Sequence, residues 1–155
     1  MKKLAIAALV VVAGCRAHAT TAELRAGGAA APREAIERFI GAAKAQDYDG
    51  MSLAFGSADG PARAVPPKGI TRKQRRSWPN DLKQREFIMM RCLRHDRVQI
   101  GTETPTPTGA RVYGVQVWFK DLTATTNFTV VQGPNERWYV LQFEPDPLQR
   151  ICASI

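Results

Sequence analysis

The thiols of three cysteines offer the clearest chemistry in this sequence, and the surroundings of the first decide what the other two can do. Cys15 directly follows an apolar run over residues 4–13, which itself follows Lys2 and Lys3. A charged start, a short apolar run and small residues at its end are typical of an export signal, and this run is too short to span a bilayer as a mature helix. The sequence therefore predicts that residues 1–14 are a signal peptide.

The tetrad Val12-Ala13-Gly14-Cys15 resembles the lipobox of bacterial lipoproteins. The resemblance implies that the Cys15 sulfur is diacylated, that the signal is cut before it, and that the new amine is acylated, with palmitate-type chains. Several acyl chains anchor a protein firmly, at about 0.8 kcal/mol for each buried methylene, whereas one chain is marginal. Arg16, in place of an aspartate, implies the outer membrane, facing the periplasm, in a host that has one. The alternative is an ordinary signal peptide with a chance cysteine.

Acylation of Cys15 would leave Cys92 and Cys152 as the remaining thiols. Beyond the inner membrane thiols meet an oxidising compartment, so we expect a disulfide between these two. Cys92 lies near the end of a predicted helix and Cys152 just past the last predicted strand, so the tail could fold back across that helix. The alternative is two buried, unpaired cysteines that behave as small apolar residues.

Metal chemistry has no support in the sequence. It contains no CxxC pattern and no Cys/His spacing of a zinc site, and His18 and His95 are isolated from one another. We therefore predict no metal site and no cofactor.

The charge of the chain favours contact with anionic surfaces. Its formal net charge is +8, and loss of Lys2 and Lys3 with the signal leaves +6. Basic residues concentrate between Asp59 and Asp81, where no acidic residue occurs. The simplest interpretation of this run is a solvated loop, and the alternative hypothesis is that four of its basic residues contact anionic lipid headgroups, with no nucleic acid expected as a partner. These four are Arg72, Lys73, Arg75 and Arg76.

Composition and hydrophobic spacing predict a tether followed by helices. Residues 15–31 carry Ala, Thr and Gly without a hydrophobic period, which indicates a flexible segment before a single domain at 32–155. Pro32 opens the first helix, and Asp47 can cap a second one that stops at Gly56. Residues 56–79 contain several prolines and glycines, which predict a loop, with a helical turn at most. The third helix is expected over Asp81 to Arg94, with the near-helical positions Leu82, Glu86, Met89/Met90 and Leu93.

From residue 97 onward the apolar residues alternate, which predicts strands. The expected strands are 97–102, 112–119, 123–131 and 137–143, joined by hairpin-sized loops. Helices first and an antiparallel meander second is an α+β order, in which one face of a four-stranded antiparallel sheet covers the helices. The residues expected on that face are Tyr113, Val115, Val117, Phe119, Tyr139, Leu141 and Phe143.

Two segments carry a family resemblance. REAIERFIGAAKAQDYDGMSLAFGSADG, residues 33–60, resembles the opening helices of the nuclear transport factor 2-like superfamily of cystatin-like cones. FTVVQGPNERWYVLQFEPDPLQRIC, residues 128–152, resembles the closing hairpin of bacterial lipoproteins in that superfamily. The resemblance implies a cone, with N-terminal helices packed on a curved sheet. It implies little about activity, because the superfamily includes enzymes, transport factors and lipoproteins.

Enzymes of this superfamily use a carboxylate, or an Asp–His pair with a tyrosine, inside the cone. The nearest equivalents here are His95 and Asp96 with Tyr48 or Tyr113. Because Arg94 and Arg97 flank this pair, we interpret it as a solvated junction and assign no catalytic residue.

Two hypotheses for the function follow. The first is a membrane-anchored envelope protein whose domain binds a ligand or partner without catalysis, and the second is a small isomerase or hydrolase that uses the interior of the cone. A polar-lined cavity would favour the enzyme, whereas an interior filled by Phe39, Phe87 and Tyr113 would favour binding.

Trp118 and Trp138 are predicted on the outer face of the sheet, together with Gln116, Val140 and Gln142. Two indoles on one face could form a partner surface for an envelope protein or for a second copy of the chain. The alternative is that the loop or the tail covers them.

Overall fold

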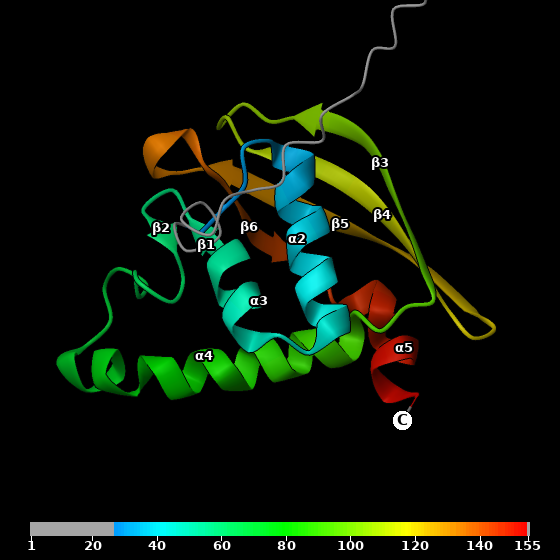
Figure 1. Cartoon of the computed structure of the whole chain (residues 1–155), viewed down its shortest axis with the longest axis horizontal. Coiled ribbons are helices and arrows are strands. Elements are labelled where there is room, and N and C mark those ends of the chain that lie inside the picture. The colour runs from blue at the N-terminus through cyan, green and yellow to red at the C-terminus, as the bar shows by residue number, and fades with distance from the viewer. Residues whose placement is uncertain (1–26, 155) are drawn as a thin grey trace, which may run out of the picture.

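The computed structural model of the chain describes residues 27–154. The signal peptide, Cys15 and most of the predicted tether lie outside the described residues. Figure 1 shows α2 and α3 on one side of the sheet and the long helix α4 running below both. The elements are α2 (Pro32–Ala45), α3 (Tyr48–Ala54), β1 (Gly56–Ser57), β2 (Gly60–Pro61), α4 (Arg72–Cys92), β3 (Arg97–Pro105), β4 (Arg111–Phe119), β5 (Leu122–Gln132), β6 (Trp138–Phe143) and α5 (Gln149–Ala153).

The sheet confirms the predicted α+β class. Its four strands lie in the order β3-β4-β5-β6, and each pairs antiparallel with the next one along the chain. On β4, buried Tyr113, Val115 and Val117 alternate with more exposed neighbours, as the sequence predicts. Phe128 on β5 pairs with Tyr113 and continues the same buried face.

A bulge changes which side of β6 faces the core. Val130 pairs with Val140 and Thr129 with Gln142, so Leu141 has no partner in the register. Val140 is therefore buried in the core, whereas Leu141 is exposed. The predicted inward position of Leu141 and outward position of Val140 are both wrong, because the extra residue shifts the alternation by one.

Tyr139 is buried as expected, but on the other face of the sheet from Val140. Its ring packs against Gly28, Gly56 and Gly133, at each of which an added Cβ would come within 2.8 to 3.0 Å of the ring. These glycines are needed for the close approach of the ring to the backbone.

The packed domain begins before Pro32. The fully buried Ala29 exchanges two backbone hydrogen bonds with Trp138, of 2.8 and 2.9 Å. The guanidinium group of Arg137 donates to the carbonyl oxygens of Gly27 and Gly28 at 3.2 and 3.1 Å. Residues 27–31, which were predicted as part of the tether, therefore belong to the domain.

An aromatic cluster fills the core between α2 and the sheet. Phe39 is fully buried, and its ring centroid lies 6.0 Å from that of Phe55, 6.3 Å from that of Phe128 and 6.4 Å from that of Phe143. Rings at these separations bury large apolar areas and attract one another in tilted geometry. Phe87, predicted as a third filler of this interior, is instead 51% exposed on α4.

Candidate interaction surface

Helix α4 begins earlier than the sequence predicts. The hydroxyl of its N-cap, Thr71, accepts a hydrogen bond from the backbone N–H of Gln74, and the Gln74 side chain accepts one from the backbone N–H of Thr71. This capping box satisfies two N–H groups that the helix would otherwise leave unpaired. Pro79 lies inside the helix. The predicted loop over residues 56–79 is therefore wrong from residue 72 onward.

The inner face of α4 holds the helix on the domain. Trp78, Leu82, Glu86 and Met90 recur every four residues and are all buried. The indole N–H of Trp78 donates a 2.8 Å hydrogen bond to the carbonyl oxygen of Ala62 in the loop before α4. The N-terminal half of the helix is therefore held mainly by a small separate cluster rather than by the main core.

A disulfide fixes the other end of α4. Cys92, the last helical residue, is bonded to Cys152 of α5, and the two Cα atoms are 4.1 Å apart. This confirms the predicted pairing and ties α4 to the tail that follows the sheet.

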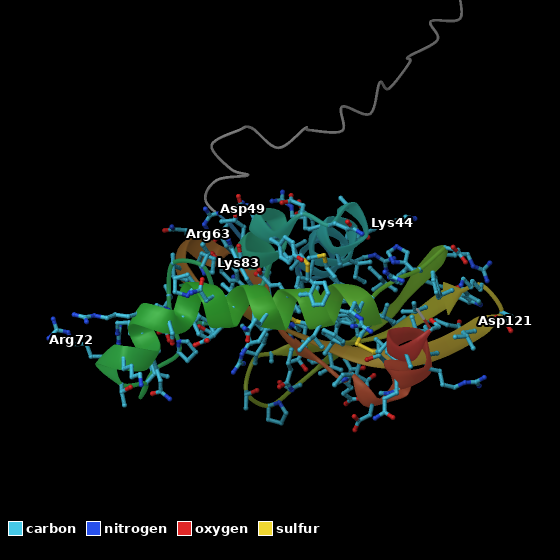
Figure 2. The ribbon with its side chains drawn as sticks, turned by 90° about the horizontal axis from the view of Figure 1, so that it is seen from below. Lys44, Asp49, Arg63, Arg72, Lys83 and Asp121 are labelled. Atoms are coloured by element: carbon cyan, nitrogen blue, oxygen red, sulfur yellow. A yellow bond between two sulfur atoms is a disulfide. The ribbon has the colours of Figure 1, made fainter. Side chains whose placement is uncertain are left out.

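The basic residues predicted to contact anionic headgroups lie in the first turns of α4. Arg72, Lys73, Arg75 and Arg76 are all exposed. Figure 2 shows Arg72 at the tip of α4, where the helix extends beyond the sheet. No acidic residue occurs in the first turn. Positive charge at a helix N-terminus opposes the helix dipole, so these residues do not stabilise α4 locally.

Further along α4, apolar side chains lie exposed beside basic ones. Phe87 is 51% and Ile88 61% exposed. Phe87 and Tyr48 line two adjoining hollows between α4 and the corner of α2 and α3. The larger hollow, of about 740 Å³, also contains Lys83, and the smaller one contains Arg91. The two hollows are lined by apolar side chains together with basic ones and, in the larger hollow, the acidic Asp47 and Asp49.

Glu86 is a buried carboxyl group that the sequence placed on the helical face without assigning it a role. It is 1% exposed, and within residues 27–154 its Oε1 atom has no hydrogen-bond partner. Burial, and second the charge of Asp49, raise the pKa of Glu86 to about 7, although Arg63 and Lys83 act in the opposite direction. The position of a glutamate among apolar residues of the helical repeat was the available signal.

The residues nearest to a catalytic set are engaged separately. His95 Nδ1 lies 2.8 Å from the carbonyl oxygen of Leu93, and Asp96 accepts a 2.7 Å hydrogen bond from the backbone N–H of Lys120. Tyr113 donates a 2.6 Å hydrogen bond to Glu103, and burial, followed by this bond, raises the Tyr113 pKa to about 12. Tyr48 lines one hollow together with His95 but not with Asp96. These contacts give each group a structural role.

The structure does not bring Trp118 and Trp138 to one face of the sheet. Trp138 packs against the main core with Val140, while Trp118 follows the buried Val117 and points to the opposite face. The guanidinium carbon of Arg97 lies 3.9 Å from the centre of the Trp118 ring. The two indoles therefore do not form the predicted common partner face.

Within residues 27–154, no group of three His, Cys, Asp or Glu side chains could hold a metal ion. In the same part of the chain, no helix is both long enough and apolar enough to cross a bilayer.

No protein family matches the sequence, and neither a characterised protein nor a solved structure is significantly similar to it.

Proposed function

We propose that this protein is a membrane-anchored lipoprotein of the bacterial envelope whose domain binds a partner without catalysing a reaction. The signal-like residues 1–14, the lipobox-like tetrad ending at Cys15 and the following tether support the anchor. The packing of helices on a four-stranded antiparallel sheet supports a cystatin-like cone as the specific fold.

One observation carries the choice of binding over catalysis. The space between α2 and the sheet is occupied by the ring of Phe39 and its aromatic neighbours, where an enzyme of the resembled superfamily would hold its acid–base groups. The exposed basic and apolar side chains lie outside the core, on α4. A filled core with such an outer face suits docking better than turnover. Anionic headgroups, another envelope protein and a second copy of the chain are the partner classes that this proposal includes.

The alternative function, a small isomerase or hydrolase, is favoured by one residue. Glu86 has a pKa of about 7, and a carboxyl group poised near neutral pH is typical of acid–base catalysts. Glu86 lies on the inner face of α4, however, and only 1% of the residue is exposed. Substrate would reach it only if α4 moved away from α3.

Intact mass spectrometry tests the anchor. The protein purified in detergent from a bacterial host should begin at Cys15 and carry the added mass of a diacylglyceryl group and an amide-linked acyl chain. The matched variant Cys15→Ser should lack this mass. A mature chain that begins at any later residue, or an unmodified Cys15, would contradict the proposal.

A further inference from the structure

Helix α4 carries more positive charge than the acidic residues around it compensate. Its basic residues outnumber its acidic ones, which are Asp81 and the buried Glu86. Within residues 27–154, no ion pair joins a basic side chain of α4 to a carboxylate, whereas Arg63 pairs with Asp49 at 2.5 Å and Lys68 with Asp59 at 2.9 Å. The basic residues of α4 are Arg72, Lys73, Arg75, Arg76, Lys83, Arg85 and Arg91.

Part of this charge forms a stripe with an apolar centre. Lys73, Arg76, Lys83, Phe87 and Arg91 are separated by three, seven, four and four positions, which places them along one side of an α-helix. Residues at multiples of four from the inner-face Glu86 lie on the other side, packed against the domain. Figure 2 views α4 from below, with Lys83 labelled at the edge of the helix that lies nearest to Asp49 and Arg63.

The residues beside this stripe are also apolar or basic. Ile88 is exposed next to Phe87, and the exposed Lys44 and Arg94 line the hollow that Phe87 shares with α2. The carboxylates of Asp47 and Asp49 line the other hollow, but Asp49 is paired with Arg63 and Asp47 caps the N-terminus of α3. The surface therefore has a short apolar ridge inside a basic border, the combination found in helices that lie in the interface of anionic bilayers.

We propose that this outer side of α4 lies on an anionic lipid surface, with Phe87 and Ile88 entering the headgroup layer and the basic side chains contacting lipid phosphates. This inference rests on the proposed function only in identifying the membrane as that of the bacterial envelope. Charge complementarity favours an anionic lipid surface over a neutral one. The short chain between Cys15 and the domain favours the membrane that holds the proposed anchor. Between Cys15 and Gly27 a fully extended chain reaches at most about 40 Å. The backbone N–H of Gly28 bonds to Leu53 of α3, the helix beside α4.

Vesicle binding by unlipidated protein tests this surface apart from the anchor. Residues 15–155 with Cys15→Ser contain every contact of the described structure, and their failure to bind vesicles would leave the acylation of Cys15 untouched. We expect sedimentation with vesicles containing phosphatidylglycerol at low salt, and little with pure phosphatidylcholine. Binding should fall steeply as ionic strength rises, because salt screens exposed charges beyond about 10 Å at 0.1 M.

Matched variants locate the contact. The triple variant Lys73→Gln, Arg76→Gln, Lys83→Gln should lower the partition coefficient about 100-fold, at about fivefold for each basic side chain. The control Arg97→Gln, Lys120→Gln, Arg150→Gln has the same net charge but leaves α4 unchanged, and should retain most of the binding. Phe87→Ala with Ile88→Ala should weaken binding beyond the exposed apolar control, Leu141→Ala.

The proposal would be overturned by equal binding to neutral and anionic vesicles, by equal losses in the two charge variants, or by no loss when Phe87 and Ile88 are both replaced. Absence of vesicle binding at low salt would also overturn it, in favour of an acidic protein as the occupant of this face.

Discussion

Glu86 should make the stability of the domain depend on pH, and a neutral isostere should remove that dependence. The pKa of this carboxyl group is raised from 4.5 to about 7 in the folded protein, mainly because burial penalises the charged form. Below pH 4.5 both the folded and the unfolded chain hold the proton, so Glu86 contributes no difference. Between pH 4.5 and 7 the unfolded chain releases a proton that the folded chain retains, so the free energy of unfolding falls as pH rises.

The size of the effect follows from the shift. A displacement of about 2.5 pKa units at about 1.4 kcal/mol each makes the ionised folded state less stable by about 3 kcal/mol. This is a large share of the 5 to 15 kcal/mol typical of a small domain. Above pH 7 the loss is complete and the contribution stays constant. Glu86→Gln keeps the shape of the side chain and carries no charge at any of these pH values.

Urea unfolding of the disulfide-bonded protein between pH 4.5 and 8.5 is the assay. We expect the variant to gain about 3 kcal/mol relative to the wild type across this range, with most of the change between pH 5 and 7. Glu136→Gln, at an exposed glutamate, provides the control and should track the wild type. A difference between Glu86→Gln and wild type that does not vary with pH would refute the reasoning, since it would mean that Glu86 is solvated or paired in the folded state.

Two further predictions concern the attachment of α4. Replacing both Cys92 and Cys152 by alanine should lower the free energy of unfolding by about 4 kcal/mol. This is the chain-entropy value for a disulfide that joins residues 60 positions apart. A loss below about 1 kcal/mol in denaturant titrations would contradict it. Trp78→Phe removes the donor to the Ala62 carbonyl oxygen and should cost about 1 to 3 kcal/mol, because that buried acceptor loses its partner. In hydrogen exchange, this variant should expose the N-terminal half of α4 before the sheet, and uniform exposure of both would argue that α4 is not held locally.

The parts of the fold that follow simple periodic rules could be predicted from the sequence. Pro32 at the start of α2, Asp47 as the cap of α3, and the alternation of Tyr113, Val115 and Val117 each have one structural meaning, and the structure agrees with all of them. The disulfide between Cys92 and Cys152 was also predictable, because lipidation at the first cysteine would leave a single pair.

Other features could not be predicted because two signals compete at the same residues. Pro79 indicates a loop, but the capping box at Thr71 and Gln74 starts the helix at Arg72 rather than at Asp81, and the buried Trp78 keeps it on the domain. On β6 the residues on both sides of the strand are apolar, so nothing in the sequence shows that Leu141 is the bulged residue. Such choices are decided by contacts with distant residues rather than by local preference.

On α4, several features lower stability rather than raise it. Four basic residues at its start oppose the helix dipole, Phe87 and Ile88 leave apolar area in water, and Glu86 occupies a buried position that a leucine would fill at lower cost. By contrast, α2 has an acidic residue in its first turn, a lysine in its last and an apolar buried face. Local rules are most often broken where a surface serves something other than stability. The unfavourable energetics of α4 therefore fall on the same element whose charge and exposure support the proposed lipid-binding surface.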